Sequence, residues 1–165
     1  MALMYGDELY NDIRDCIQAI LESLKSEMKA SNILPRIEAI YDTPEQGIMS
    51  FPAVTISLQG ITNIDEAVDS FNDAIIYSAC SCSIRCHVDY EGGRKDEEKT
   101  LLLLGSIQNY IRENARARLK SALGSRFISM NFRDESIQLG LNFADSLTIG
   151  GEYKFSLITQ LTYAR

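Results

Sequence analysis

Three cysteines and the chain's only histidine lie between positions 80 and 87, and they are the most obvious candidates for chemistry. Thiolates and imidazoles bind zinc, and a cysteine beside a histidine can act as a nucleophile pair. Either use requires the side chains to converge on one point. Cys80, Cys82 and Cys86 instead occupy alternate positions of residues 79–90, and His87 falls between them.

This alternation has the period of a half-buried strand, which we expect to be the central strand of a small sheet. On a strand, thiols two positions apart lie roughly 7 Å from each other, and His87 points to the opposite face. A tetrahedral zinc site usually takes its ligands from a tight knuckle, so this geometry disfavours zinc. Free cysteine behaves as a small hydrophobe, and we predict that these thiols pack in the core, with no metal and no cofactor.

The remaining candidates for chemistry have structural explanations. The glycine pairs at 92–93 and 150–151 belong to no phosphate-binding motif, since neither follows a strand and opens a helix with the required spacing. The acidic run at 96–98 precedes a helix, where the helix dipole favours it. With no recognisable nucleophile, base or phosphate loop, we predict that the protein is not an enzyme.

Composition limits the classes further. A chain of 165 residues is expected to form a single domain, residues 1–165, with one core. Its formal net charge of −7 argues against general nucleic-acid binding. No apolar run approaches the length of a membrane span, and the N-terminal residues lack the pattern of a signal peptide. We therefore expect a reducing cytoplasm and free thiols.

The first half of the chain begins with an amphipathic helix over residues 7–30, stopped by Asn32 and Pro35. An extended piece at 36–41 and a turn-rich loop at 42–47 follow. Residues 51–60 predict a strand that ends at Gly60. Residues 61–76 have apolar residues at helical spacing but several acidic ones, so two alternatives stay open: a short amphipathic helix or a long acidic loop that contacts a partner.

In the second half, the charged residues 91–100 lead to a helix over 101–123, which Gly124 terminates. The arginines near its end are either a solvated face or a contact with an acidic neighbour. Strands follow at 127–132 and from Ile137, separated by a charged turn at 133–136, and a last strand runs from Tyr153. The order predicts an α+β fold: an antiparallel sheet with two helices packed on one face.

Local motifs add a family resemblance. Thr43, Pro44, Gln46 and Gly47 form a polar loop before an apolar strand that begins near Pro52. Asp89 and Tyr90 precede a direct passage from strand to helix. With the amphipathic first helix and the closing strands, this pattern resembles the tail terminator, or tail completion, proteins of tailed bacteriophages.

The resemblance implies a structural virion protein, assembled in the host cytoplasm and located at the head-proximal end of the tail. Such subunits form a homo-oligomer, a hexameric ring, that caps the tail tube, ends its polymerisation and meets a head-tail connector or neck protein. DNA passes through the lumen without specific binding, which suits an acidic chain, and no membrane is involved.

From the loops and the arginines we select interface candidates toward the tail tube protein and the neck. They are Pro44, Gln46, Phe51, Asp65, Phe71, Arg112, Arg116 and Arg126. We also expect the strand that ends the chain to leave an edge exposed for a neighbouring subunit. Two alternatives remain: another neck or head-tail connector component, and a small cytoplasmic module that binds a metal or another ligand.

Overall fold

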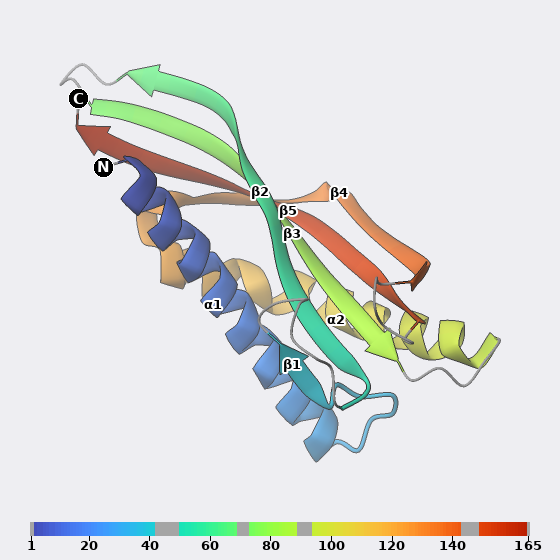
Figure 1. Cartoon of the computed structure of the whole chain (residues 1–165). Coiled ribbons are helices and arrows are strands. Elements are labelled where there is room, and N and C mark those ends of the chain that lie inside the picture. The colour runs from blue at the N-terminus through green and yellow to red at the C-terminus, as the bar shows by residue number, and fades with distance from the viewer. Residues whose placement is uncertain (1, 42–49, 69–72, 89–93, 143–148, 165) are drawn as a thin grey trace.

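The computed structural model describes residues 2–41, 50–68, 73–88, 94–142 and 149–164, which form two long helices and a five-stranded sheet (Figure 1). The strand order is β1-β2-β3-β5-β4. The elements are α1 (Ala2–Ala30), β1 (Ala39–Tyr41), β2 (Ala53–Val68), β3 (Asp73–Val88), α2 (Arg94–Leu123), the short 3-10 helix η1 (Gly124–Arg126), β4 (Phe127–Asn142) and β5 (Ile149–Ala164). The predicted α+β fold is confirmed, and β3 is the central strand.

The sheet is mixed rather than purely antiparallel as predicted. β1 is parallel to β2, with Ala39 opposite Ala53, whereas the other neighbouring strands are antiparallel. α1 packs beside β1, β2 and α2, and α2 packs against β3, β4 and β5. Figure 1 shows the two helices side by side along the sheet.

Both helices end where the sequence predicts. Asn32 has a left-handed φ of 52°, and the Ile33 amide donates to the Met28 carbonyl at 2.9 Å, which is the pattern of a Schellman cap. Gly124, with φ of 60°, ends α2 in the same backbone region. α2 begins earlier than predicted, at Arg94, because the charged residues at 94–100 form its first turns instead of a separate entry segment.

The core lies between the helices and one face of the sheet. α1 supplies residues at three- and four-residue steps, and the strands supply alternate residues. Its members include Leu9, Ile13, Ile17, Leu21, Met28, Val54, Ile56, Cys80, Cys82, Ile84, Cys86, Leu104, Ile107, Ile111, Tyr153, Phe155 and Leu157, none more than 1% exposed. α2 approaches β5 so closely that a Cβ on Gly151 would lie 2.7 Å from Leu104 Cδ1, which explains this glycine through packing.

The prediction for residues 61–76 is wrong in both of its forms. β2 does not end at Gly60 but continues to Val68, and β3 begins at Asp73, so the two strands make one long antiparallel hairpin. β-branched residues are frequent here, and irregular register after Leu58 and after Asn63 disturbs the period of two, so the apolar spacing imitates a helix.

The end of the chain also differs from the prediction. Residues 133–136 do not separate two strands, because β4 runs continuously from Phe127 to Asn142, with its largest register irregularity between Asn131 and Ser136. β5 is not an edge strand over most of its length, since it lies between β3 and β4. Its pairing with β4 begins at Thr159, opposite Phe127, so residues 160–164 extend past the described end of β4.

Candidate functional site

The thiols on β3 face the helices and are completely buried. Cys80, Cys82 and Cys86 each have 0% of their surface exposed, which confirms the predicted core packing. The hydrogen bond with Cys80 and burial both raise the pKa of Cys82, and burial raises the pKa of Cys86. These two thiols therefore remain protonated, which is the unreactive form of cysteine.

His87 lies on the opposite face of β3, as the alternation predicts. Its Nε2 is 3.2 Å from Thr55 Oγ1 on β2, and the residue is only 2% exposed. Burial and the nearby charge of Arg85 lower the pKa of His87 to about 4, so the ring is neutral at pH 7. Histidine and thiols thus point away from each other and cannot share one ligand or substrate.

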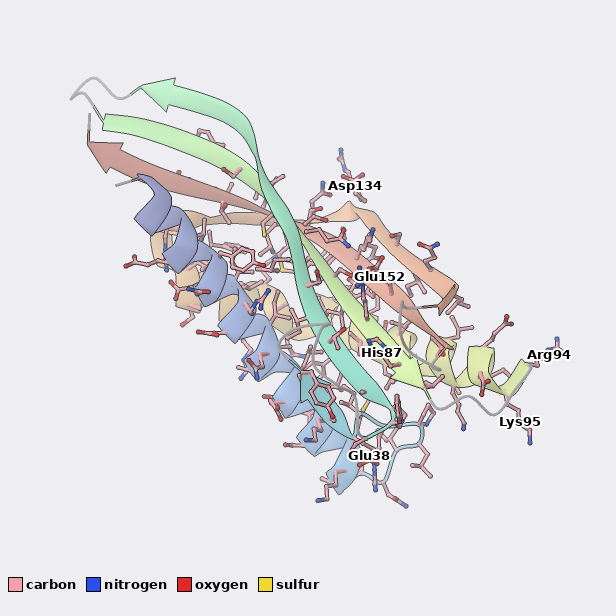
Figure 2. The ribbon with its side chains drawn as sticks, viewed as in Figure 1. Glu38, His87, Arg94, Lys95, Asp134 and Glu152 are labelled. Atoms are coloured by element: carbon pink, nitrogen blue, oxygen red, sulfur yellow. The ribbon has the colours of Figure 1, made fainter. Side chains whose placement is uncertain are left out.

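The same helix-free face carries a polar group that the sequence analysis did not select, which we call the Glu152 cluster: Ser83, Arg85, Glu152 and Lys154. Glu152 accepts hydrogen bonds from Ser83 Oγ at 2.5 Å and from Arg85 Nε at 3.0 Å. Lys154 Nζ lies 3.3 Å from its other oxygen. Arg85 is directly opposite Glu152 in the β3–β5 ladder, so cross-strand pairing assembles the cluster (Figure 2).

The electrostatics of the Glu152 cluster favour a permanent carboxylate. Burial by itself raises the pKa of Glu152, but the hydrogen bonds from Ser83, Arg85 and Lys154 outweigh it and leave that pKa below its usual value. The residue is 5% exposed, and both oxygens are engaged. Such an arrangement positions strands. The alternation at 152–156 could have placed Glu152 and Lys154 on one face of a strand, but it gives no sign of their partners on β3.

A second buried carboxylate joins β4 to the helix layer, in what we call the Glu135 cluster: Gln108, Arg112, Glu135 and Tyr153. Glu135 accepts hydrogen bonds from Tyr153 Oη at 2.8 Å and from Gln108 Nε2 at 2.9 Å, and it forms an ion pair with Arg112. Its side chain is 8% exposed. Burial raises the pKa of Tyr153 to about 12, so the hydroxyl stays protonated at pH 7 and donates the hydrogen bond to Glu135.

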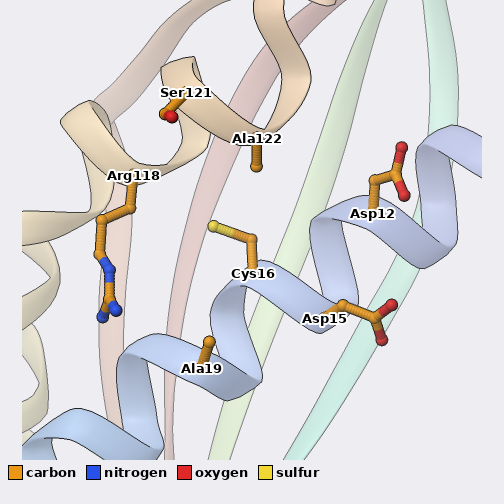
Figure 3. Close-up of a pocket in the computed structure, with 7 residues that line it drawn as sticks. All are labelled: Asp12, Asp15, Cys16, Ala19, Arg118, Ser121 and Ala122. Carbon is orange, nitrogen blue, oxygen red and sulfur yellow. The ribbon is translucent and has the colours of Figure 1, made fainter.

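A shallow groove of about 400 Å³ lies between the two helices (Figure 3). α1 contributes Asp12, Asp15, Cys16 and Ala19, and α2 contributes Arg118, Ser121 and Ala122. The Cys16 thiol points toward α2, and burial raises its pKa although the charge of Arg118 opposes the change. Asp12, which lines the groove, forms an ion pair with Arg126 at 2.7 Å.

The predicted interface residues fall into three groups. Pro44, Gln46 and Phe71 lie outside the described residues. Asp65 lies in β2 opposite Tyr77, and its side chain is outside the described part of the structure. Phe51 lies two positions before the first residue of β2 and is half-buried. Their role in an interface stays a prediction.

The three arginines do not make one continuous basic surface. Arg112 belongs to the Glu135 cluster on the β4 side of α2. Arg126 pairs with Asp12 of α1 and donates to the Leu123 carbonyl at 3.1 Å. Arg116 is exposed and makes no ion pair with another described residue. Of the three, Arg116 therefore has the charge most available to a partner.

Comparison with known proteins gives no relative: no protein-family model and no curated protein matches the chain. Within the described ranges, no three Cys, His, Asp or Glu side chains gather in a way that could hold a metal ion. Neither helix, over the residues that are described, has a stretch both long and apolar enough to cross a bilayer.

Proposed function

We propose that the protein is a structural subunit of a tailed-bacteriophage virion that caps the tail tube as a ring. In this role it ends tube polymerisation and presents a surface to the head-tail connector or neck protein. The order of elements, a helix, a hairpin that enters a second helix, and two closing strands, supports the proposal because it agrees with the resemblance in the sequence. The observation that carries it is the way the sheet extends.

The extension consists of residues 65–68, 73–77 and 160–164, which we call the arm. In the arm, Asp65 pairs with Tyr77 and Tyr77 with Gln160, so three strands continue past Thr159, where β4 begins to pair. Figure 1 shows these strand ends together at the end of the sheet where both chain termini lie. Strands that extend past the end of β4 leave backbone groups and surface available to a neighbouring subunit.

The charge of the arm suits a contact between unlike surfaces. The arm contains Asp65, Glu66 and Asp73 and no lysine or arginine. The second half of α2 is basic instead, with Arg116, Arg118 and Lys120 all exposed. Complementary charges on different parts of one subunit favour a head-to-tail contact, and such contacts close into rings when the rotation permits.

Native mass spectrometry of the purified protein, alone and mixed with tail tube protein, tests the proposal. We expect a six-subunit assembly in at least one of these samples, and tubes that stop growing when the protein is added. A protein that stays monomeric in both, with tubes that grow unchecked, would overturn the proposal.

Charge reversal in the arm refines the test. Asp65→Lys with Glu66→Lys should abolish the ring while the subunit stays folded, because it reverses the charge of the arm. The matched control is Glu97→Lys with Glu98→Lys, which makes the same charge change at exposed positions of α2 and should keep the ring. A ring that survives the arm variant would remove the arm from the interface.

A further inference from the structure

β4 is one of the two edge strands of the sheet, and the described residues place no strand on its outer side. An uninterrupted edge is a template for pairing with a second copy of the same chain. The pairing of β4 with β5 shifts by a small step near each end, between Phe127 and Ser129 and between Leu139 and Leu141, and by a larger step in the middle. Residues 132–135 lie opposite a single residue of β5, Phe155, because the pairing passes from Asn131 with Ser156 to Ser136 with Lys154. We call residues 132–135 the β4 bulge.

The bulge is built into the local sequence. Asn131 Oδ1 accepts the Arg133 amide at 2.8 Å, and its Nδ2 donates to Asp134 Oδ2 at 3.3 Å, so this side chain turns the backbone out of the ladder. Figure 2 shows Asp134 at the bend of β4. The bulge also changes which residues face the helices: Met130 does so before it, opposite Leu157, and Ile137 does so after it, opposite Tyr153.

Glu135, the last residue of the bulge, has a nearly buried side chain. Glu135 is held by donors from two different elements, Gln108 and Arg112 of α2 and Tyr153 of β5. Arg112 also lies over the Phe132 ring, 5.7 Å from its centre, so it contacts both ends of the bulge. A carboxylate fixed by three donors in a nearly buried position is costly to displace.

We propose that Glu135 is a latch that holds the β4 bulge in place and thereby keeps the outer edge of the sheet from pairing along its length with a second copy. While Glu135 keeps its donors, a strand from a second copy that pairs with β4 is interrupted after Asn131. With the latch removed, the bulge can move along β4 and longer regular segments become available. The inference does not depend on the proposed ring, because the ring contact is assigned to the arm.

Glu135→Ala tests the latch, with Asp134→Asn as the control. Asp134 lies in the same bulge and is exposed, and asparagine at this position removes a carboxylate charge but keeps an oxygen that can accept the hydrogen bond from Asn131. We expect amide hydrogen exchange at 132–136 to become at least about tenfold faster in Glu135→Ala, as loss of charged hydrogen bonds implies. Light scattering should show a several-fold larger fraction of irregular, high-mass assemblies. Asp134→Asn should match the unaltered protein in both measurements.

A second comparison separates the latch from general destabilisation. Cys82→Ala weakens the core under the helices without removing any of the donors to Glu135, and it should not produce high-mass assemblies. If Glu135→Ala does not fold, Tyr153→Phe and Gln108→Leu each remove one donor and should show smaller changes of the same kind. The proposal is overturned if folded latch variants keep the size distribution and the exchange rates of the unaltered protein, or if Cys82→Ala or Asp134→Asn associates equally.

Discussion

Both faces of β3 carry fully buried side chains, Cys82 and Ile84 on one and Ser83 on the other, yet different interactions stabilise them. The face beneath the helices is a row of small apolar groups, Cys80, Cys82, Ile84 and Cys86, in the common core. The other face holds Ser83, Arg85 and His87, which have polar partners on β2 and β5. Exposure alone does not separate a packed face from a hydrogen-bonded one.

The two faces differ in how strictly each one determines which side chains can pack beside it. An apolar face accepts any partner of suitable volume, whereas a buried carboxylate needs donors at fixed positions. Glu152 meets Arg85 directly and Ser83 diagonally only when β3 and β5 have the observed register. The polar face therefore specifies the register between β3 and β5, and the thiol face contributes buried apolar surface. The predictions below test this division, from the largest effect to the smallest.

Replacing Glu152 with alanine should have the largest effect. The change leaves Ser83, Arg85 and Lys154 without their common acceptor, and we expect the free energy of unfolding to fall by about 3–4 kcal/mol. Denaturant titration measures it. The control is Glu38→Ala, which breaks the exposed pair with Arg36 at 2.8 Å and should cost less than about 0.5 kcal/mol. Equal losses in the two variants would contradict a special role for the polar face.

His87 should make stability depend on pH. Its folded pKa of about 4 lies below the unfolded value of 6.5, so its contribution is complete above pH 6.5 and is lost as pH falls toward 4. Allowing for partial solvent screening, we expect the free energy of unfolding to fall by about 2–3 kcal/mol as the pH is lowered across this window. The pKa of Glu152 is lowered from its usual value, so this carboxylate stays ionised over the upper part of the window.

The measurement for His87 is the free energy of unfolding at several pH values between 7 and 4.5. His87→Asn should flatten the dependence, since the asparagine cannot gain a proton there. An equally steep loss in His87→Asn would show that other groups cause the acid sensitivity.

Replacing Cys82 with alanine should cost about 1 kcal/mol, because it truncates a small core side chain. Assembly should be unchanged in the folded variant. Cys16→Ala at the half-buried groove should cost less. A loss from Cys82→Ala as large as that from Glu152→Ala would mean that the thiol face is as specific as the polar face.

Thiol labelling tests the burial of the thiol face directly, because it compares the solvent access of the cysteines without any substitution. Cys16 is half-buried, while the other three cysteines are buried. An aromatic disulfide reagent at pH 8 should modify Cys16 in the native protein and reach Cys80, Cys82 and Cys86 only on unfolding. Early reaction of a β3 thiol would indicate that the helix layer opens over it.

The sequence predicted most of the fold through local patterns. The alternation at 80–88 predicted both faces of the central strand, and the helix stops at Asn32 and Gly124 are observed. The hairpin at 61–76 was missed because register irregularities break the strand period. The bulge at 132–135 imitated a turn, since its polar residues are those that turns prefer.

The polar clusters could not be predicted, because their members lie far apart in the chain. Glu152 is an ordinary charged residue until β5 is known to pair with β3, and Glu135 until α2 is known to cover β4. The faces of single strands were predictable. Which strands would be neighbours was not, because strand order depends on contacts between distant segments.

The central position of β3 also has a consequence for synthesis on the ribosome. β2 is made before β3 and can pair with it at once, but the other edge of β3 must wait for β5: Val88 pairs with Ile149, and Asp73 with Ala164. The chain between them contains α2, so that helix can cover the thiol face while one edge of β3 still lacks its partner. Ladders between such distant segments form slowly, so the nascent chain carries a strand with one unpaired edge until β5 has been made.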